Sequence, residues 1–154
     1  MTTQTGITAA ELAHIAALTL ESMREMVAVR ERHSAMRPDV DTSARLAEMR
    51  ALTAEIEADA TQAAAAAARN DAAGAMRART RAGDHSFQVR ELDRLIGLTY
   101  RAERQVRELI DAGHDKGVVD AALAQVRSDK GLIDAGQIAE VERMVENFQD
   151  ASGD

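Results

Sequence analysis

Apolar residues recur every three or four positions along three long stretches of the chain, which is the spacing of amphipathic helices. The first stretch predicts a helix over residues 9–36, with Glu21 and Glu25 on its polar side. Thr8, followed three residues later by Glu11, has the form of a capping box, which satisfies free amides at a helix start. The predicted apolar side consists of Leu12, Ile15, Ala16, Leu20, Met23, Met26 and Val27.

The second stretch begins after Pro38, because a proline prevents the residue before it from staying helical. A helix is predicted from about Ala44 to Ala68, and beyond Ile56 its packing face is only alanine. Before that point the apolar stripe consists of Leu46, Met49, Leu52 and Ile56. An alanine face suits the close approach of another backbone, or it marks a segment that is helical by propensity but poorly anchored. We favour close packing.

The segment Arg69–Ser86 has the least regular pattern, and we interpret it as a helix end that frays into an exposed loop. A third helix is predicted from Phe87 to about Ala112, with Ser86 as its N-cap and Gly113 as its stop. Its apolar side consists of Leu92, Leu95, Ile96, Thr99, Ala102, Val106, Leu109 and Ile110.

Two shorter helices are predicted over 118–127 and 135–149, and the tail 151–154 is expected to fray. A length of 154 residues fits a single domain, which we place at 1–150. The predicted fold is therefore all-α, a helical bundle of about five helices. Short connections favour antiparallel neighbours, so the first three helices should form an up-down-up stack that the last two close at one end.

Composition narrows the setting of the protein. The chain has no cysteine, which excludes disulfides, thiolate catalysis and thiolate metal sites. No apolar run approaches the roughly 20 residues that span a bilayer, and the first residues carry no basic region typical of an export signal. We expect a cytoplasmic protein, or one within an assembly formed in the cytoplasm, and no membrane partner.

The formal net charge of −7 is unevenly distributed. Residues 1–68 carry ten acids against six bases, and residues 108–154 carry eleven against four. Between them, residues 69–107 carry five acids against nine bases, all of them arginine. This segregation could join subunits head to tail, because surfaces of opposite charge attract.

Candidate metal and catalytic residues lack the partners that their chemistry needs. Glu11 and His14 match Glu-x-x-His once, but His14 falls on the polar side of its helix, where a solvated surface histidine is expected. Asp111 and His114 repeat the spacing at a predicted helix end. The Asp111–Ala122 region lacks the regular acidic ligands of a calcium loop. We predict no metal and no cofactor.

No arrangement of side chains typical of catalysis is recognisable either. His33 and His85 have no serine or carboxylate at a diagnostic spacing, so we expect surface or capping roles for them. Glu103 falls within the apolar arc of the third predicted helix, and Arg107 lies one turn later. The spacing predicts an i,i+4 ion pair at the edge of the core rather than a catalytic acid.

The clearest functional signal is a basic face on the third predicted helix. Four of its arginines fall within about an 80° arc at 100° per residue, opposite the apolar stripe, and three more precede them. The candidate interaction residues are Arg77, Arg79, Arg81, Arg90, Arg94, Arg101 and Arg104. They could bind an anion, a nucleic-acid backbone or an acidic protein surface. Pairing with acids within or between subunits is the interpretation we favour.

These features predict a non-catalytic helical protein–protein interaction or assembly module that self-associates, such as an adaptor, a scaffold or a virion-type structural component. The partner would be a protein or a second copy of the chain. The alternative is a nucleic-acid-associated regulator that uses the arginines of residues 77–104, which the acidic net charge and the scarcity of aromatic residues disfavour. An enzyme whose site forms only through tertiary proximity is a third alternative.

Overall fold

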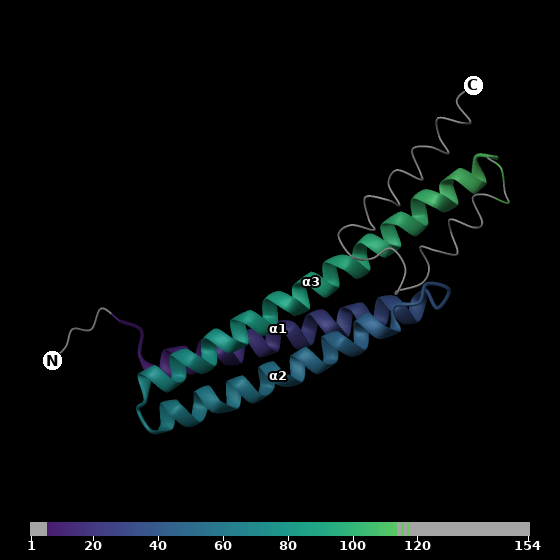
Figure 1. Cartoon of the computed structure of the whole chain (residues 1–154). Helices are drawn as coiled ribbons and strands as arrows, with labels where there is room; N and C mark the ends of the chain where they lie inside the picture. The colour runs from purple at the N-terminus through teal and green to yellow at the C-terminus, as the bar shows by residue number, and fades with distance from the viewer. Residues whose placement is uncertain (1–5, 114, 116, 118–154) are drawn as a thin grey trace. The chain divides into compact units, whose positions relative to one another are not determined.

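The computed structural model describes residues 6–113, 115 and 117, and these form three α-helices (Figure 1). The helices are α1 (Ala9–Met36), α2 (Ser43–Ala68) and α3 (Ala72–Asp111). The described ranges contain no extended sheet, which confirms the predicted all-α class. The two shorter helices predicted over 118–127 and 135–149, and the tail 151–154, lie outside the described residues, so a count of five helices stays a prediction.

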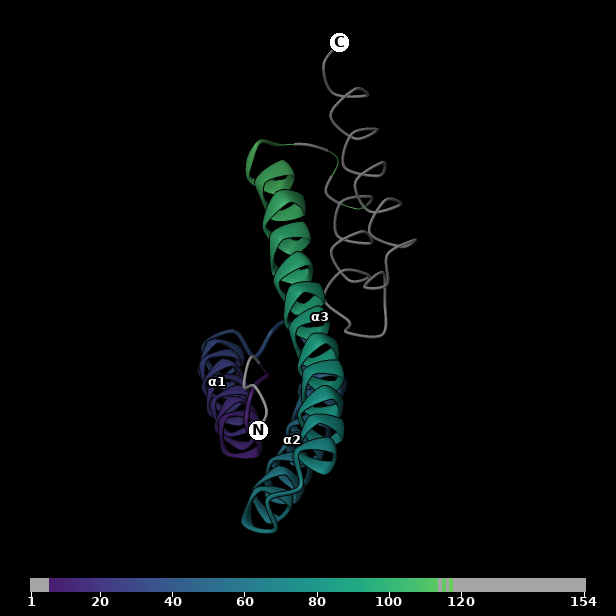
Figure 2. The same cartoon turned by 90° about the vertical axis from the view of Figure 1, so that its left-hand side faces the viewer.

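The contacts of the chain group into two compact units. The described part of the first unit is 6–30 and 47–92, and that of the second is 31–46 and 93–113 with 115 and 117. In the first unit the segments of α1, α2 and α3 lie alongside one another in alternating directions, as predicted for three helices joined by short turns (Figures 1 and 2). None of the described helices is both long and apolar enough to cross a bilayer.

Local sequence signals set the boundaries of the first two helices. The capping box of α1 is confirmed, since the Thr8 amide donates to Glu11 Oε1 and the Glu11 amide donates to Thr8 Oγ1, both at 3.1 Å. These hydrogen bonds, first the one from the Thr8 backbone, lower the pKa of Glu11. At α2, the backbone amide and hydroxyl of Ser43 donate to Asp41 Oδ1 at 3.1 and 2.7 Å, so Asp41 caps the helix.

The prediction of an irregular segment over Arg69–Ser86 is wrong. After a short turn in which Asn70 adopts a φ of 56°, Asp71 Oδ1 accepts the Gly74 amide at 2.9 Å, and α3 begins at Ala72. Ser86 is not a cap: it is buried within α3 and donates its hydroxyl to the Gly83 carbonyl at 2.8 Å. The predicted stop is confirmed, because α3 ends before Gly113, whose φ is 87°.

The reason for this longer helix is a seam of residues, all buried except the half-buried His85, that alternates spacings of three and four, the heptad pattern of packed helices. Its members on α3 in the first unit are Ala75, Ala78, Ala82, His85, Val89 and Leu92. In the second unit they are Ile96, Thr99 and Glu103. Alanine is a strong helix former, and its small side chain gives the first turns of α3 a packing face despite their weak hydrophobicity.

Close packing of the alanine face of α2 is confirmed. Ala66 of α2 clusters with Ala75 of α3 and with Ala9 and Leu12 of α1, and all four are at most 4% exposed. A Cβ added at Gly74 would lie only 3.3 Å from that of Ala66, which shows how closely the two backbones approach. Larger side chains fill the rest of the first unit's core, namely Met23, Met49, Ile56 and Val89.

Candidate functional site

The seven arginines predicted to form an interaction surface all lie on α3 and are all exposed. Four belong to the first unit, namely Arg77, Arg79, Arg81 and Arg90, and three to the second, namely Arg94, Arg101 and Arg104. Arg77, Arg79 and Arg81 were expected in a loop before the helix. Because α3 already begins at Ala72, they project from a regular helix instead.

These arginines differ in their partners. Arg81 pairs with Asp59 and also donates to the side-chain oxygen of Gln62. Five of the other six make no ion pair with the residues that the structure describes, namely Arg77, Arg79, Arg90, Arg101 and Arg104. The interpretation favoured from the sequence was pairing with acids within or between subunits, and among the described residues pairing within one chain accounts for only part of this set.

Asp59 forms a buried polar cluster within the first unit. It lies on α2 and is 4% exposed. His85 Nδ1 of α3 is 2.8 Å from Asp59 Oδ2, and Arg81 Nε is 3.4 Å from Oδ1. His85 thus has a carboxylate partner that sequence spacing could not reveal, and the expectation of a surface or capping role for it is wrong. The available signal was its position on the buried seam of α3.

Removing the Asp59 carboxylate should leave His85 and Arg81 without their shared partner. We expect Asp59→Ala to lower the free energy of unfolding by about 2 kcal/mol, the scale of hydrogen bonds to a buried charged group. Glu57→Ala is the matched control, because Glu57 lies on the same helix as Asp59 but its pair with Arg24 of α1 is 56% exposed on both sides and should contribute less than about 0.5 kcal/mol. Urea denaturation of both variants measures the difference, and equal losses would contradict a structural role for the buried cluster.

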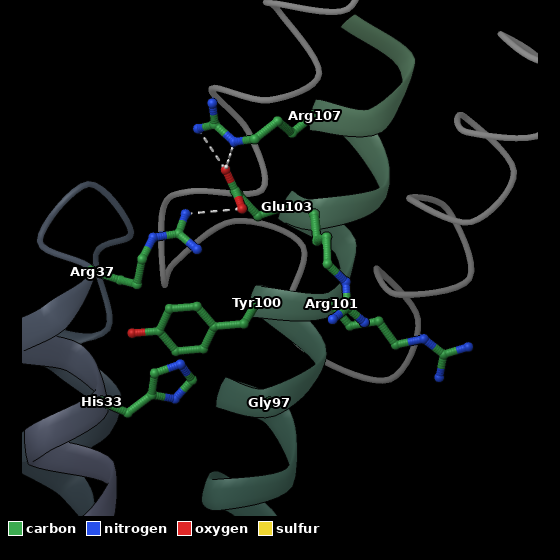
Figure 3. A pocket seen from close by; sticks show the side chains of 8 residues that line it. His33, Arg37, Gly97, Tyr100, Arg101, Glu103 and Arg107 are labelled. Carbon is green, nitrogen blue, oxygen red and sulfur yellow. Dashed lines mark hydrogen bonds and ion pairs between the residues drawn. The ribbon is translucent and has the colours of Figure 1, made fainter. Parts of the chain in front are cut away.

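In the second unit, Glu103 is the centre of another buried polar cluster (Figure 3). Its side chain is 1% exposed, and its Oε1 accepts from Arg107 Nε at 3.0 Å and Nη2 at 2.9 Å. The predicted i,i+4 pair is therefore confirmed. Arg37, from the segment that follows α1, was not foreseen: its Nη2 lies 3.0 Å from Glu103 Oε2, on the other side of the carboxylate.

Asp39 extends this cluster. Arg37 donates to both of its carboxylate oxygens, from Nε at 3.0 Å and from Nη2 at 2.8 Å, and Arg107 Nη2 lies 3.8 Å from Oδ2. The hydrogen bonds from Arg37 lower the pKa of Asp39, and the same bonds, followed by those with Glu103, raise the pKa of Arg37. Arg37 and Arg107 are consequently held between two carboxylates.

Two aromatic rings lie beside the cluster. The rings of His33 and Tyr100 stack with centroids 4.2 Å apart and planes 25° apart, and the Arg37 guanidinium carbon is 6.0 Å from the Tyr100 centroid. The Tyr100 hydroxyl lies 3.3 Å from Ser34 Oγ, which lies 2.6 Å from Thr42 Oγ1. His33 is half-buried in this stack, so the expectation of a plain surface or capping role for it is wrong.

A pocket of about 290 Å³ opens at this place in the second unit (Figure 3). Its lining residues are His33, Arg37, Gly97, Tyr100, Arg101, Glu103, Arg104 and Arg107. Two of the predicted interaction residues, Arg101 and Arg104, thus line the same pocket as two arginines that sequence reasoning did not assign to the basic face. The pocket lining therefore contains four arginines, of which Arg37 and Arg107 contact the buried Glu103 carboxylate.

The candidate metal ligands named from the sequence do not come together. His14 is exposed on α1, Asp111 is exposed at the end of α3, and His114 lies outside the described residues. Within the described residues, no group of three or more histidine and acidic side chains is placed to hold a metal ion.

Comparison of the chain with protein-family models, with curated proteins and with solved structures finds no match.

Proposed function

We propose that this protein is a non-catalytic helical assembly module that associates with further copies of itself through the first unit. The observation that carries the proposal is Phe87, whose side chain is 69% exposed on α3, three residues before an arginine without an ion-pair partner in the described ranges. Aromatic and arginine side chains are enriched at protein interfaces and supply most of their binding energy.

The surroundings of Phe87 favour a protein partner. Phe87, Leu52 and Leu92 line a shallow hollow of about 430 Å³ in the first unit, and two glutamates, Glu48 and Glu91, border it. An apolar centre with a charged rim is the usual composition of an interface patch. Within the same unit, Arg77, Arg79 and Arg90 make no ion pair with the described residues.

A second copy of the chain fits this surface because the hollow has an apolar centre bordered by Glu48 and Glu91, and Arg90 lies three residues after Phe87 on the same helix. In a twofold assembly the same patch contacts itself, so the arginines of one copy can face the glutamates of the other. We therefore infer self-association as the first role, with an adaptor, scaffold or virion-type component as the biological setting.

Light scattering after size exclusion, at low and high salt, tests self-association. We expect a defined oligomer that weakens with salt, and Phe87→Ala should weaken it at least about tenfold, as truncation of a central aromatic side chain does. Leu18→Ala is the control, because Leu18 is also a large exposed apolar residue, 49% exposed, on α1 of the same unit. A monomer at every salt concentration, or equal effects of both substitutions, would overturn the proposal.

The alternative is a nucleic-acid-associated regulator, and it is favoured by Arg77, Arg79 and Arg90 of α3, which make no ion pair with the part of the chain that the structure describes. Replacing Arg77, Arg79 and Arg90 together with alanine separates the two functions. Binding of DNA or RNA at low salt that the triple substitution abolishes would support the regulator, since phosphate contacts depend on these charges. The absence of binding to either nucleic acid at low salt would exclude it.

A further inference from the structure

We propose that the pocket of the second unit binds the phosphate group of a small molecule, either inorganic phosphate or a small phosphomonoester. The proposal rests on a juxtaposition: Arg37 and Arg107 are held in place by the buried Glu103, and Arg101 and Arg104 line the same pocket without an ion pair in the described ranges. It does not depend on self-association, which uses residues of the first unit.

The charge of the pocket selects an anion. Its lining contains four arginines and one glutamate. Glu103 offsets one arginine charge and Asp39, beside Arg37, offsets another, so the net charge at the pocket stays positive. A concave surface lined by charges of one sign concentrates the field and attracts ions of the opposite sign. A doubly charged phosphate gains more from this field than a carboxylate does.

The two held arginines retain donors that the cluster does not use. Arg37 and Arg107 contact the carboxylates through Nε and Nη2, and none of these contacts involves Nη1 of either guanidinium. Their side chains are 35% and 45% exposed, so an ion in solution can reach them. Because the carboxylates already fix the two guanidinium planes, the binding of an anion to these two arginines loses less side-chain entropy.

Arg101 and Arg104 supply the second half of the site. They lie three residues apart on α3, which places them on neighbouring turns of one side of the helix. Both are exposed, and Figure 3 shows Arg101 extending from α3 away from Glu103. Guanidinium groups bind phosphate oxygens through paired, charge-assisted hydrogen bonds, so these two exposed side chains can contribute to binding by turning toward an ion at the held pair.

The size of the pocket limits the ligand. Sites for drug-sized molecules occupy roughly 300 to 1,000 Å³, and a pocket of about 290 Å³ is at the lower end of that range. A phosphate group with a short organic substituent fits such a volume, whereas a dinucleotide does not. The ligand class is therefore a small phosphate compound.

Titration of the full chain with inorganic phosphate tests the proposal, with calorimetry for affinity and amide NMR for position. We expect saturable binding with shifts at the amides of Gly97 and Tyr100. Arg101→Ala combined with Arg104→Ala should weaken binding at least about tenfold, since each substitution removes a charge-assisted contact. The control is Arg77→Ala combined with Arg79→Ala, which removes the same charge from exposed positions of α3 in the first unit and should change the affinity less than about twofold.

Two results would overturn the proposal: the absence of saturable phosphate binding at low salt, or equal weakening by the two double variants, which would indicate general charge attraction. A parallel titration with glycerol phosphate distinguishes inorganic phosphate from a phosphomonoester as the preferred ligand. Tighter binding of the ester than of inorganic phosphate would support a phosphomonoester, and equal affinities would support the phosphate group alone. Light scattering of the Arg101/Arg104 double variant should show the wild-type mass, which separates this site from self-association.

Discussion

Replacement of Glu103 by alanine is expected to lower the free energy of unfolding by about 3 kcal/mol, because it removes the shared partner of two arginines and leaves a space in the packed seam. Breaking a buried ion pair by deleting one member costs about 3 to 5 kcal/mol in general. The lower end applies here, since Arg37 and Arg107 are 35% and 45% exposed and can regain hydration.

Glu108→Ala provides the control for this substitution. Glu108 lies on the same helix, five residues after Glu103, but is exposed, so its loss should change the free energy of unfolding by less than about 0.5 kcal/mol. Urea denaturation followed by circular dichroism gives both values. If the Glu103 variant were as stable as the Glu108 variant, the buried cluster would contribute nothing to the folded state.

Enlargement of a buried alanine should have a comparable effect in the first unit. Ala66→Leu adds three heavy atoms where α2 meets α3 and α1, and Ala66 is 1% exposed. We expect a loss of about 2 kcal/mol, because overpacking forces neighbouring side chains off their rotamers or moves the backbone. On the α3 side the added atoms would meet Ala75 and the backbone at Gly74, where a Cβ would already lie 3.3 Å from that of Ala66.

Ala64→Leu is the matched substitution, two residues earlier in the same alanine run but at an exposed position. It makes the same change in composition and in helix propensity and should alter the free energy of unfolding by less than about 0.5 kcal/mol. Thermal and urea unfolding of the pair compare the two faces of α2 directly. Equal stabilities would mean that the alanine face does not pack closely.

The predictable parts of the fold were those set by local sequence signals. The capping box at Thr8 and the break at Pro38 bound the first helix, and α1 has the predicted limits of 9–36. The start of α3 was missed because Ala75, Ala78 and Ala82 contrast little in hydropathy with their neighbours. Their packing face becomes evident only when the alanines of α2 are placed against them.

The same distinction applies to the polar clusters. The Glu103–Arg107 pair follows from a spacing of four residues on one helix, so the sequence predicted it. The contacts of Asp59 with His85 and of Glu103 with Arg37 join residues from different segments, and no periodicity encodes them. The pocket beside Tyr100 is lined by both Arg37 and Glu103, so it depends on the second of these contacts and was beyond prediction from the sequence.

The alanines of α3 in the first unit, Ala75, Ala78 and Ala82, are alike in size and therefore do little by themselves to select one alignment of α3 along α2. Ala75 and Ala82 are one heptad apart and have identical side chains, so at this one position a shift by one heptad would again place an alanine against α2. Such a shift would separate Asp59 from His85 and leave a buried carboxylate without its partner, which is costly. We expect the alanines to set the distance between the helices and the Asp59–His85 pair to select one alignment of them.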